Sequence, residues 1–248
     1  PWTVAEIRES IPNRHAMDKY VADRGMSCLP GNTAQHSLDG NIAGFSHEDA
    51  SLEDLSSFTD GLDRRMGTTP AQAPNAVRRI VVTVKEGRPI ELDGQRLAAT
   101  AMLEAANAAG GTSGLGLYDV LESRVNGTKC RGVYEAPGME VLSAAVEAAY
   151  EASIDRPASR LRQILSTQLG DSIYDGSSTS VAARAARAGL EEMACFSNAV
   201  VALGLFKGSV IEKAVLSSDP RAGLIHQRRF AGNGHNWASA PLEVSHNS

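Results

Sequence analysis

The sequence lacks the features of disulfide-rich and membrane-spanning proteins. Its 248 residues include three cysteines, Cys28, Cys130 and Cys195, which lie far apart and form no C-x-x-C pair. We therefore expect neither a disulfide framework nor a zinc site, and a reducing, cytoplasmic setting fits. No apolar run approaches the roughly 18–20 residues that span a bilayer, and no basic-then-apolar leader opens the chain, so we expect no membrane association.

Charge and motif content exclude further classes. A formal net charge of −5 disfavours a nucleic-acid partner. The six histidines are scattered and form no H-E-x-x-H motif, so no metal site is expected. The sequence contains no G-x-S-x-G motif that would indicate a serine hydrolase. GGTSGLG at 110–116 is as glycine-rich as a phosphate loop but does not fit G-x-x-x-x-G-K-[ST]. We interpret it first as a helix stop with close backbone packing, and phosphate contact is the alternative.

The composition, 42% hydrophobic and 21% charged, is that of a soluble globular protein with one large or two small domains. Periodicity and punctuation predict helices at 3–10, 14–25, 97–109, 138–153, 156–174 and 180–195, a helix-like stretch at 46–55, and hairpins at 79–94 and 199–216. This order predicts an α+β fold, with an antiparallel sheet built of hairpins and packed helices. We treat 1–216 as one domain and 217–248, which has little periodicity, as an irregular tail.

The helix predicted at 156–174 carries one apolar face. The residues expected to form that face are Leu161, Ile164, Leu165, Leu169 and Ile173. Their spacing is that of a helix packed on a core.

The segment LESRVNGTKCRGVYEAPG, 121–138, combines charges of both signs with a tyrosine and glycines between two helical patterns. We interpret it as a polar loop whose glycines at 127, 132 and 138 remove Cβ bulk or permit positive φ. Composition and spacing alone lead no further than a soluble α+β domain with such a loop.

The same segment with its preceding residues, YDVLESRVNGTKCRGVYEAPG, strongly resembles a motif of argininosuccinate synthases, D-x-x-E-N-R-x-x-x-x-K-S-R-G-x-Y-E-x-P-G. The matching residues are Asp119, Glu122, Arg124, Lys129, Arg131, Gly132, Tyr134, Glu135, Pro137 and Gly138. HSLDGNIAGFSHE, 36–48, is similar to the family's [YW]-S-x-D-x-N-x-x-x-x-S/T-x-E segment, and GRPIELDGQRL, 87–97, to its G-x-P-V-x-L-N-G hairpin. The initial P-W is also similar to a P-W of the family. The resemblance runs from residue 1 to about 216.

The resemblance implies a ligase of arginine biosynthesis that joins citrulline to aspartate with ATP through a citrullyl-adenylate. In the family, an N-terminal domain holds ATP, with magnesium, on an S-G-G-x-D-[TS]-S loop, and this chain contains no such loop. The chain therefore resembles the C-terminal, citrulline-binding half. We expect it to bind no ATP and to be inactive alone, and to form a homo-oligomer or to pair with a nucleotide-binding domain.

By resemblance, Ser37, Ser46, Glu122 and Tyr134 contact citrulline, and we expect them to converge on one pocket. The chemistry fits, since serine hydroxyls can donate to the α-carboxylate, a glutamate can pair with the α-ammonium, and a tyrosine offers an O–H. The bland alternatives are that each serine bonds its own backbone, that Glu122 pairs with an arginine of the segment, and that Tyr134 only packs.

Four further residues are possible supporting charges near a site that handles a carboxylate and phosphates. They are Asp119, Arg124, Lys129 and Arg131. The alternative is internal pairing of the cations with Asp119, Glu122 and Glu135.

The sequence departs from the family pattern at several positions. Ser123 replaces the family asparagine and Cys130 the serine of K-S-R. Thr112 and Ser113 stand where the family has a basic residue and a histidine in G-G-[RK]-H-G-x-G. The alternative function is therefore a degenerate, non-catalytic homologue that binds an amino acid or a protein partner.

Overall fold

A computed structural model describes residues 4–26, 36–49, 52, 54–56, 58–59, 62–123 and 127–218. The chain divides into two compact units: Pro1–Arg65 with Leu117–Glu135, and Met66–Gly116 with Ala136–Ser248. The predicted domain boundary at residue 216 stays a prediction, and most of the predicted tail lies outside the described residues.

The first unit begins with two short helices, α1 (Ala5–Ser10) and α2 (Arg14–Ala22). Asn13 caps α2 as the sequence indicates, because its side-chain oxygen accepts a hydrogen bond from the Ala16 N–H at 3.0 Å. Gly25, just beyond the helix, has a φ of 65°. Such positive φ is typical of a glycine that ends a helix.

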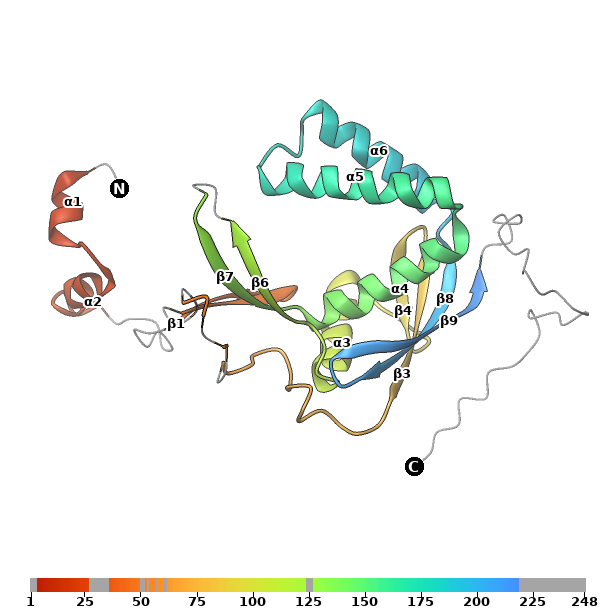
Figure 1. Cartoon of the computed structure of the whole chain (residues 1–248), viewed down its shortest axis with the longest axis horizontal. Helices are drawn as coiled ribbons and strands as arrows, with labels where there is room; N and C mark the ends of the chain where they lie inside the picture. Colours follow the sequence, from red (N-terminus) through yellow and green to blue (C-terminus); the bar gives the residue numbers. More distant parts are fainter. Residues whose placement is uncertain are drawn as a thin grey trace, which may run out of the picture. The chain divides into compact units, whose positions relative to one another are not determined.

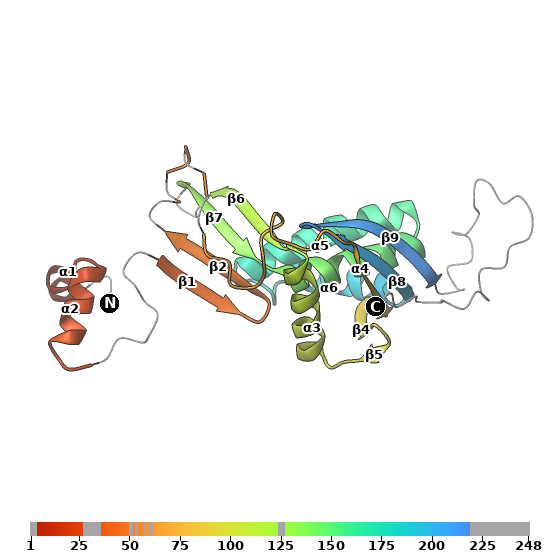
Figure 2. The same cartoon turned by 90° about the horizontal axis from the view of Figure 1, so that it is seen from below.

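A four-stranded sheet forms the main body of the first unit. Its strands are β1 (His36–Asn41), β2 (Gly44–Asp49), β6 (Leu117–Ser123) and β7 (Lys129–Glu135), in the order β1-β2-β7-β6 (Figure 2). Every neighbouring pair is antiparallel. The middle pair, β2 and β7, joins two segments that are almost ninety residues apart in the sequence.

Two sequence-based interpretations are wrong in this unit. The segment 121–138 is a hairpin of β6 and β7 followed by a helix, not a loop. The helix expected from residue 46 is also absent from the described part of that stretch, since residues up to Asp49 belong to β2. In both places the pairing with distant strands overrides the local composition.

The second unit contains a five-stranded antiparallel sheet. Its strands are β3 (Arg78–Lys85), β4 (Arg88–Leu92), β5 (Gln95–Arg96), β8 (Ala199–Phe206) and β9 (Ser209–Ser218), in the order β5-β4-β3-β8-β9 (Figures 1 and 2). Both predicted hairpins are present. Lys207 and Gly208 turn between β8 and β9 with φ of 43° and 87°, the two positive values that a type I′ turn requires.

Helices α3 (Ala99–Thr112) and α4 (Pro137–Ser153) pack against one face of this sheet. The core between them joins Ile80 and Val82 of β3, Leu203 of β8, Ala106 of α3 and Val141 of α4, all at most 1% exposed. The predicted stop at Gly110 and Gly111 is wrong, because α3 continues to Thr112. These glycines serve close packing instead, since a Cβ at Gly110 would lie 2.6 Å from the Pro137 carbonyl oxygen.

Helices α5 (Arg156–Tyr174) and α6 (Val181–Ala194) form an antiparallel helical hairpin (Figure 1). Asp155 and Ser180 cap their N-termini through side-chain oxygens. The apolar face expected on α5 is only partly used. Leu165 and Leu169 are half-buried, whereas Leu161, Ile164 and Ile173 are exposed.

The observed arrangement is the predicted α+β class with antiparallel sheets. Among the described residues, none of the helices combines the length and the apolar character needed to cross a bilayer.

Candidate functional site

The sheet of the first unit carries a row of polar side chains across all four strands. Asp39 of β1 is paired with Ser46 of β2, Ser46 with Tyr134 of β7, and Tyr134 with Tyr118 of β6. Directly paired residues share a face, and so do residues two apart along one strand. Glu122, four residues after Tyr118, therefore lies on this face too, which we name the tyrosine face.

Tyr134 and Glu122 form the closest polar contact on the tyrosine face. The Tyr134 hydroxyl donates to Glu122 Oε1 at 2.5 Å. The tyrosine side chain lies along its own strand over Gly132, where an added Cβ would come within 2.5 Å of the ring carbon Cε2. Gly132 is thus required for the ring to reach Glu122, and both side chains are half-buried.

The two predicted serines lie on the neighbouring hairpin. The Ser46 hydroxyl is half-buried and donates to the backbone carbonyl of Asp39 at 3.2 Å, which is the local bond that the bland alternative expects. Ser37 is in β1, paired with Glu48 and two residues before Asp39, but its side chain lies outside the described part of the structure. The structure thus brings Ser46, Glu122 and Tyr134 onto one face of a single sheet.

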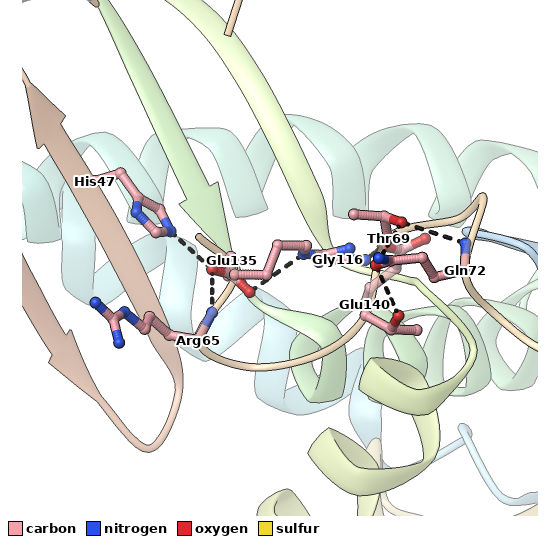
Figure 3. A network of polar contacts seen from close by, with 9 residues as sticks. His47, Arg65, Thr69, Gln72, Gly116, Glu135 and Glu140 are labelled. Carbon is pink, nitrogen blue, oxygen red and sulfur yellow. Dashed lines mark hydrogen bonds and ion pairs between the residues drawn. The ribbon is translucent and has the colours of Figure 1, made fainter. Parts of the chain in front are cut away.

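The opposite face of the same sheet holds a buried charge network around Glu135. Its carboxylate is 0% exposed and accepts from the Arg65 backbone N–H at 2.8 Å and from Arg64 Nε at 3.4 Å. His47 Nε2 lies 2.7 Å from Glu135 Oε1, with the imidazole 5% exposed (Figure 3). We name this set the Glu135 network.

Three of the predicted supporting charges, Asp119, Lys129 and Arg131, lie on the Glu135 side of the sheet. Arg131 Nε lies 3.3 Å from Asp119 Oδ1, and another guanidinium nitrogen donates to the Leu55 carbonyl. Lys129 donates to the Ser123 hydroxyl at 2.5 Å. Arg124 lies outside the described residues. For Arg131 the structure thus shows the internal pairing that was the alternative to a role at the site.

The glycine-rich stretch 110–116 has no backbone N–H left for a phosphate between residues 113 and 116. The N–H groups of Ser113, Gly114 and Leu115 donate to the Gly110 or Gly111 carbonyl. The Gly116 N–H donates to the Glu140 carboxylate at 2.6 Å (Figure 3). The segment is therefore used for packing, and its donors do not fit an anion.

Thr112 and Ser113, the departures from the family pattern, lie at the end of α3 in the second unit. The buried Ser113 hydroxyl donates to the Ala109 carbonyl. Arg78 of β3 donates to the Thr112 hydroxyl at 2.8 Å. The Arg78 guanidinium of β3 therefore lies beside the position where the family carries its own basic residue.

Sequence reasoning missed His47 and Arg64 as partners of Glu135. His47 gave a weak signal, since it follows Ser46 in a strand-like segment, and Arg64 gave none. No cluster of three or more histidine, cysteine or acidic side chains suited to a metal ion occurs in the part of the chain that the structure describes.

Comparison with known proteins relates the chain to argininosuccinate synthases. The family model described as "Arginosuccinate synthase C-terminal domain" matches residues 36–220. The chain is 31% identical over 219 residues to the argininosuccinate synthase of Burkholderia pseudomallei (strain K96243), which covers 88% of this chain and 53% of that protein. It is 32% identical over 215 residues to the one of Clostridium kluyveri, which covers 87% and 53%. The chain spans about half the length of the curated relatives it matches.

Proposed function

Because the chain belongs to the argininosuccinate synthase family and matches its C-terminal domain, we propose that it supplies the citrulline-binding part of a citrulline–aspartate ligase of arginine biosynthesis. The observation that carries the proposal is the Tyr134–Glu122 hydrogen bond on the same face as Ser46. These are three of the four residues for which the family resemblance implies contact with citrulline.

The geometry suits an amino-acid ligand. The tyrosine hydroxyl occupies one oxygen of Glu122 and fixes the orientation of the carboxylate, and the second oxygen can accept from an α-ammonium. Ser46 donates over 3.2 Å to a neutral carbonyl, which is a long bond for a hydroxyl. A carboxylate ligand offers a stronger, charge-assisted acceptor, so we infer that the hydroxyl turns to it on binding.

Separation of charges across the sheet supports the same reading. Arg131 and Asp119 are paired on the Glu135 side, so the tyrosine face presents Glu122 without a paired arginine from the described residues. A carboxylate with no ion-pair partner among the described residues, beside hydroxyl groups, suits a zwitterionic ligand of modest size.

We propose that ATP is held by residues outside this chain. The sequence contains no S-G-G-x-D-[TS]-S loop, and the donors of the glycine-rich stretch 113–116 are already bonded within the protein. The purified 248-residue chain is therefore expected to bind citrulline without releasing pyrophosphate from ATP.

The second candidate is a degenerate homologue without catalytic activity, which the Thr112 and Ser113 substitutions suggest. The Arg78–Thr112 contact argues against it, because a cation is again present at the substituted position. Arg78→Ala would separate the two, since it should reduce activity of the assembled ligase but leave a degenerate binder unaffected.

The test is calorimetric titration of citrulline into the chain and three variants. Glu122→Gln removes the partner of a full positive charge and should weaken binding by about 2–5 kcal/mol. Ser46→Ala removes one neutral donor that water can replace and should cost about 1–3 kcal/mol. Glu104→Gln, at an exposed position of α3 in the second unit, is the control and should change nothing. Equal losses for Glu122→Gln and Glu104→Gln would refute the site.

A further inference from the structure

The candidate site is divided between two hairpins of the first sheet. Ser46 belongs to the hairpin of β1 and β2, whereas Glu122 and Tyr134 belong to the hairpin of β6 and β7. Six residue pairs join β1 to β2 and seven join β6 to β7, but among the described residues three pairs join β2 to β7. The shortest pairing in the sheet therefore lies where the two halves of the site meet.

The sequence of β2 specifies this pairing weakly. The strand reads GFSHED, so it begins with a glycine, and Phe45 is its one large apolar residue. Strands that are rich in glycine or polar on both faces are prone to slip in register. Because successive side chains point to opposite faces, a slip by one residue would move Ser46 away from the tyrosine face. A further interaction is needed to hold the observed register.

The contact between His47 and Glu135 supplies that interaction. Each of the two residues lies one position along from the Ser46–Tyr134 pair, on opposite strands, so their contact crosses this pair diagonally on the other face of the sheet. His47 Nε2 lies 2.7 Å from Glu135 Oε1, and the two side chains are 5% and 0% exposed (Figure 3). A slip by one residue would turn His47 to the tyrosine face and break the contact.

The direction of this hydrogen bond follows from the other partners of Glu135. Its carboxylate accepts from the Arg65 backbone N–H at 2.8 Å and from Arg64 Nε at 3.4 Å. A carboxylate paired with a guanidinium is ionised and can only accept, so His47 donates from Nε2 whether or not Nδ1 is protonated. The contact therefore requires an N–H at the far end of the side chain, and it does not require a charge on the imidazole.

We propose that His47 is a positioning residue for the citrulline site, because its N–H bond to Glu135 holds β2 in the register that directs Ser46 to the tyrosine face. The inference rests on the proposed function, since it takes Ser46 as a contact of citrulline. His47 itself is buried on the opposite face and touches no ligand there. Its effect on affinity passes through Ser46 and cannot exceed the effect of removing the Ser46 hydroxyl.

The test compares two amides at position 47 by calorimetric titration of citrulline into the 248-residue chain. A glutamine places its amide nitrogen near the position of imidazole Nε2, whereas the shorter asparagine places it near that of Nδ1. His47→Gln keeps the donor to Glu135, so its dissociation constant should stay within about threefold of the original. His47→Asn removes this donor and should weaken binding about tenfold. The two variants have the same charge and the same functional group, so each is the matched control of the other.

A double variant separates positioning from a general loss of folding. If His47 acts through Ser46, then adding His47→Asn to Ser46→Ala should weaken binding by less than about twofold, because the hydroxyl to be positioned is already absent. A general loss of folding would weaken binding about as much in the Ser46→Ala background as in the original chain.

Equal affinities of the His47→Gln and His47→Asn variants would overturn the positioning role. A full further loss in the Ser46→Ala background would overturn it as well. A chain that binds no citrulline would refute the proposed function together with this inference, whereas citrulline binding that is unchanged by His47→Asn would refute this inference alone.

Discussion

Replacing Glu135 tests whether the buried charge network holds the first unit together. The carboxylate is wholly buried and receives the Arg65 N–H at 2.8 Å, His47 Nε2 at 2.7 Å and Arg64 Nε at 3.4 Å. These partners lie on β2 and on the segment before residue 66, whereas Glu135 ends β7. One side chain therefore connects three stretches of chain that are distant in the sequence.

The expected magnitude follows from the number of donors left without an acceptor. Glu135→Ala removes the hydrogen-bond acceptor of buried His47 and the counter-ion of Arg64, and breaking a buried pair costs about 3–5 kcal/mol. Glu135→Gln keeps one carbonyl oxygen for the Arg65 N–H, and its amide can donate to the other imidazole tautomer of His47. We therefore expect a smaller loss of about 1–3 kcal/mol for this variant.

Hydrogen exchange resolves the effect better than global unfolding, because two compact units need not unfold together. The opening free energy should fall at the amides of β2 and β7 and stay unchanged at those of β3 and β8. Glu147→Gln is the matched control, since it breaks an ion pair with Arg162 in the second unit whose side chains are 38% and 15% exposed, and should cost about 1 kcal/mol or less. If Glu135→Ala cost no more than this control, the network would contribute no stability and the reasoning would fail.

Two further results are expected. Gly132→Ala places a Cβ within 2.5 Å of the Tyr134 ring, so the ring must move away from Glu122, and citrulline affinity measured by calorimetry should fall about tenfold. The control is Gly170→Ala, which has open space around it and should leave the affinity unchanged. An unchanged affinity in Gly132→Ala would refute the positioning role of Gly132. Burial raises the pKa of Tyr150 above the usual value of about 10, although Arg162, 4.6 Å from its ring centre, opposes the shift. The unfolded chain therefore loses this proton at lower pH than the folded chain, and the stability present below about pH 10 declines above it. In thermal midpoints measured from about pH 8 to about pH 11, Tyr150→Phe should show a smaller decline than the original chain. Equal declines in the two proteins would contradict the assignment.

Local signals sufficed for the hairpins and helices of the second unit. The run RIVVTVK is β-branched, and the turn after it places Glu86 and Gly87 at φ of 49° and 69°, values that its glycine favours. The helices at 138–153, 156–174 and 181–194 have caps or prolines where their apolar periods begin. Each of these elements is specified by neighbours within one or two turns of chain.

The first unit could not be predicted in this way because its partners are distant. Arg131 pairs with Asp119 across two neighbouring strands, and Glu135 contacts His47, almost ninety residues away. Read locally, such charges indicate a solvated loop, and the pairing that turns them into strand residues is invisible. On α5 the predicted apolar face is only partly buried, and the reason is different. Its apolar residues cover a wider arc than the core can bury, and the sequence does not show whether water or another protein covers the rest.

Residues of one motif lie on both faces of the first sheet and have different roles there. Arg131, Asp119 and Glu135 pair on one side and hold the strands together, whereas Glu122 and Tyr134 bond each other on the tyrosine face. Residues of the first kind are needed for folding whether or not a ligand binds, so their presence identifies the family but not an activity. Glu122 and Tyr134 are half-buried on a face with hydroxyl neighbours, where a change removes little packing. The Tyr134–Glu122 pair over Gly132 is therefore the part of the motif on which the proposed citrulline contact rests.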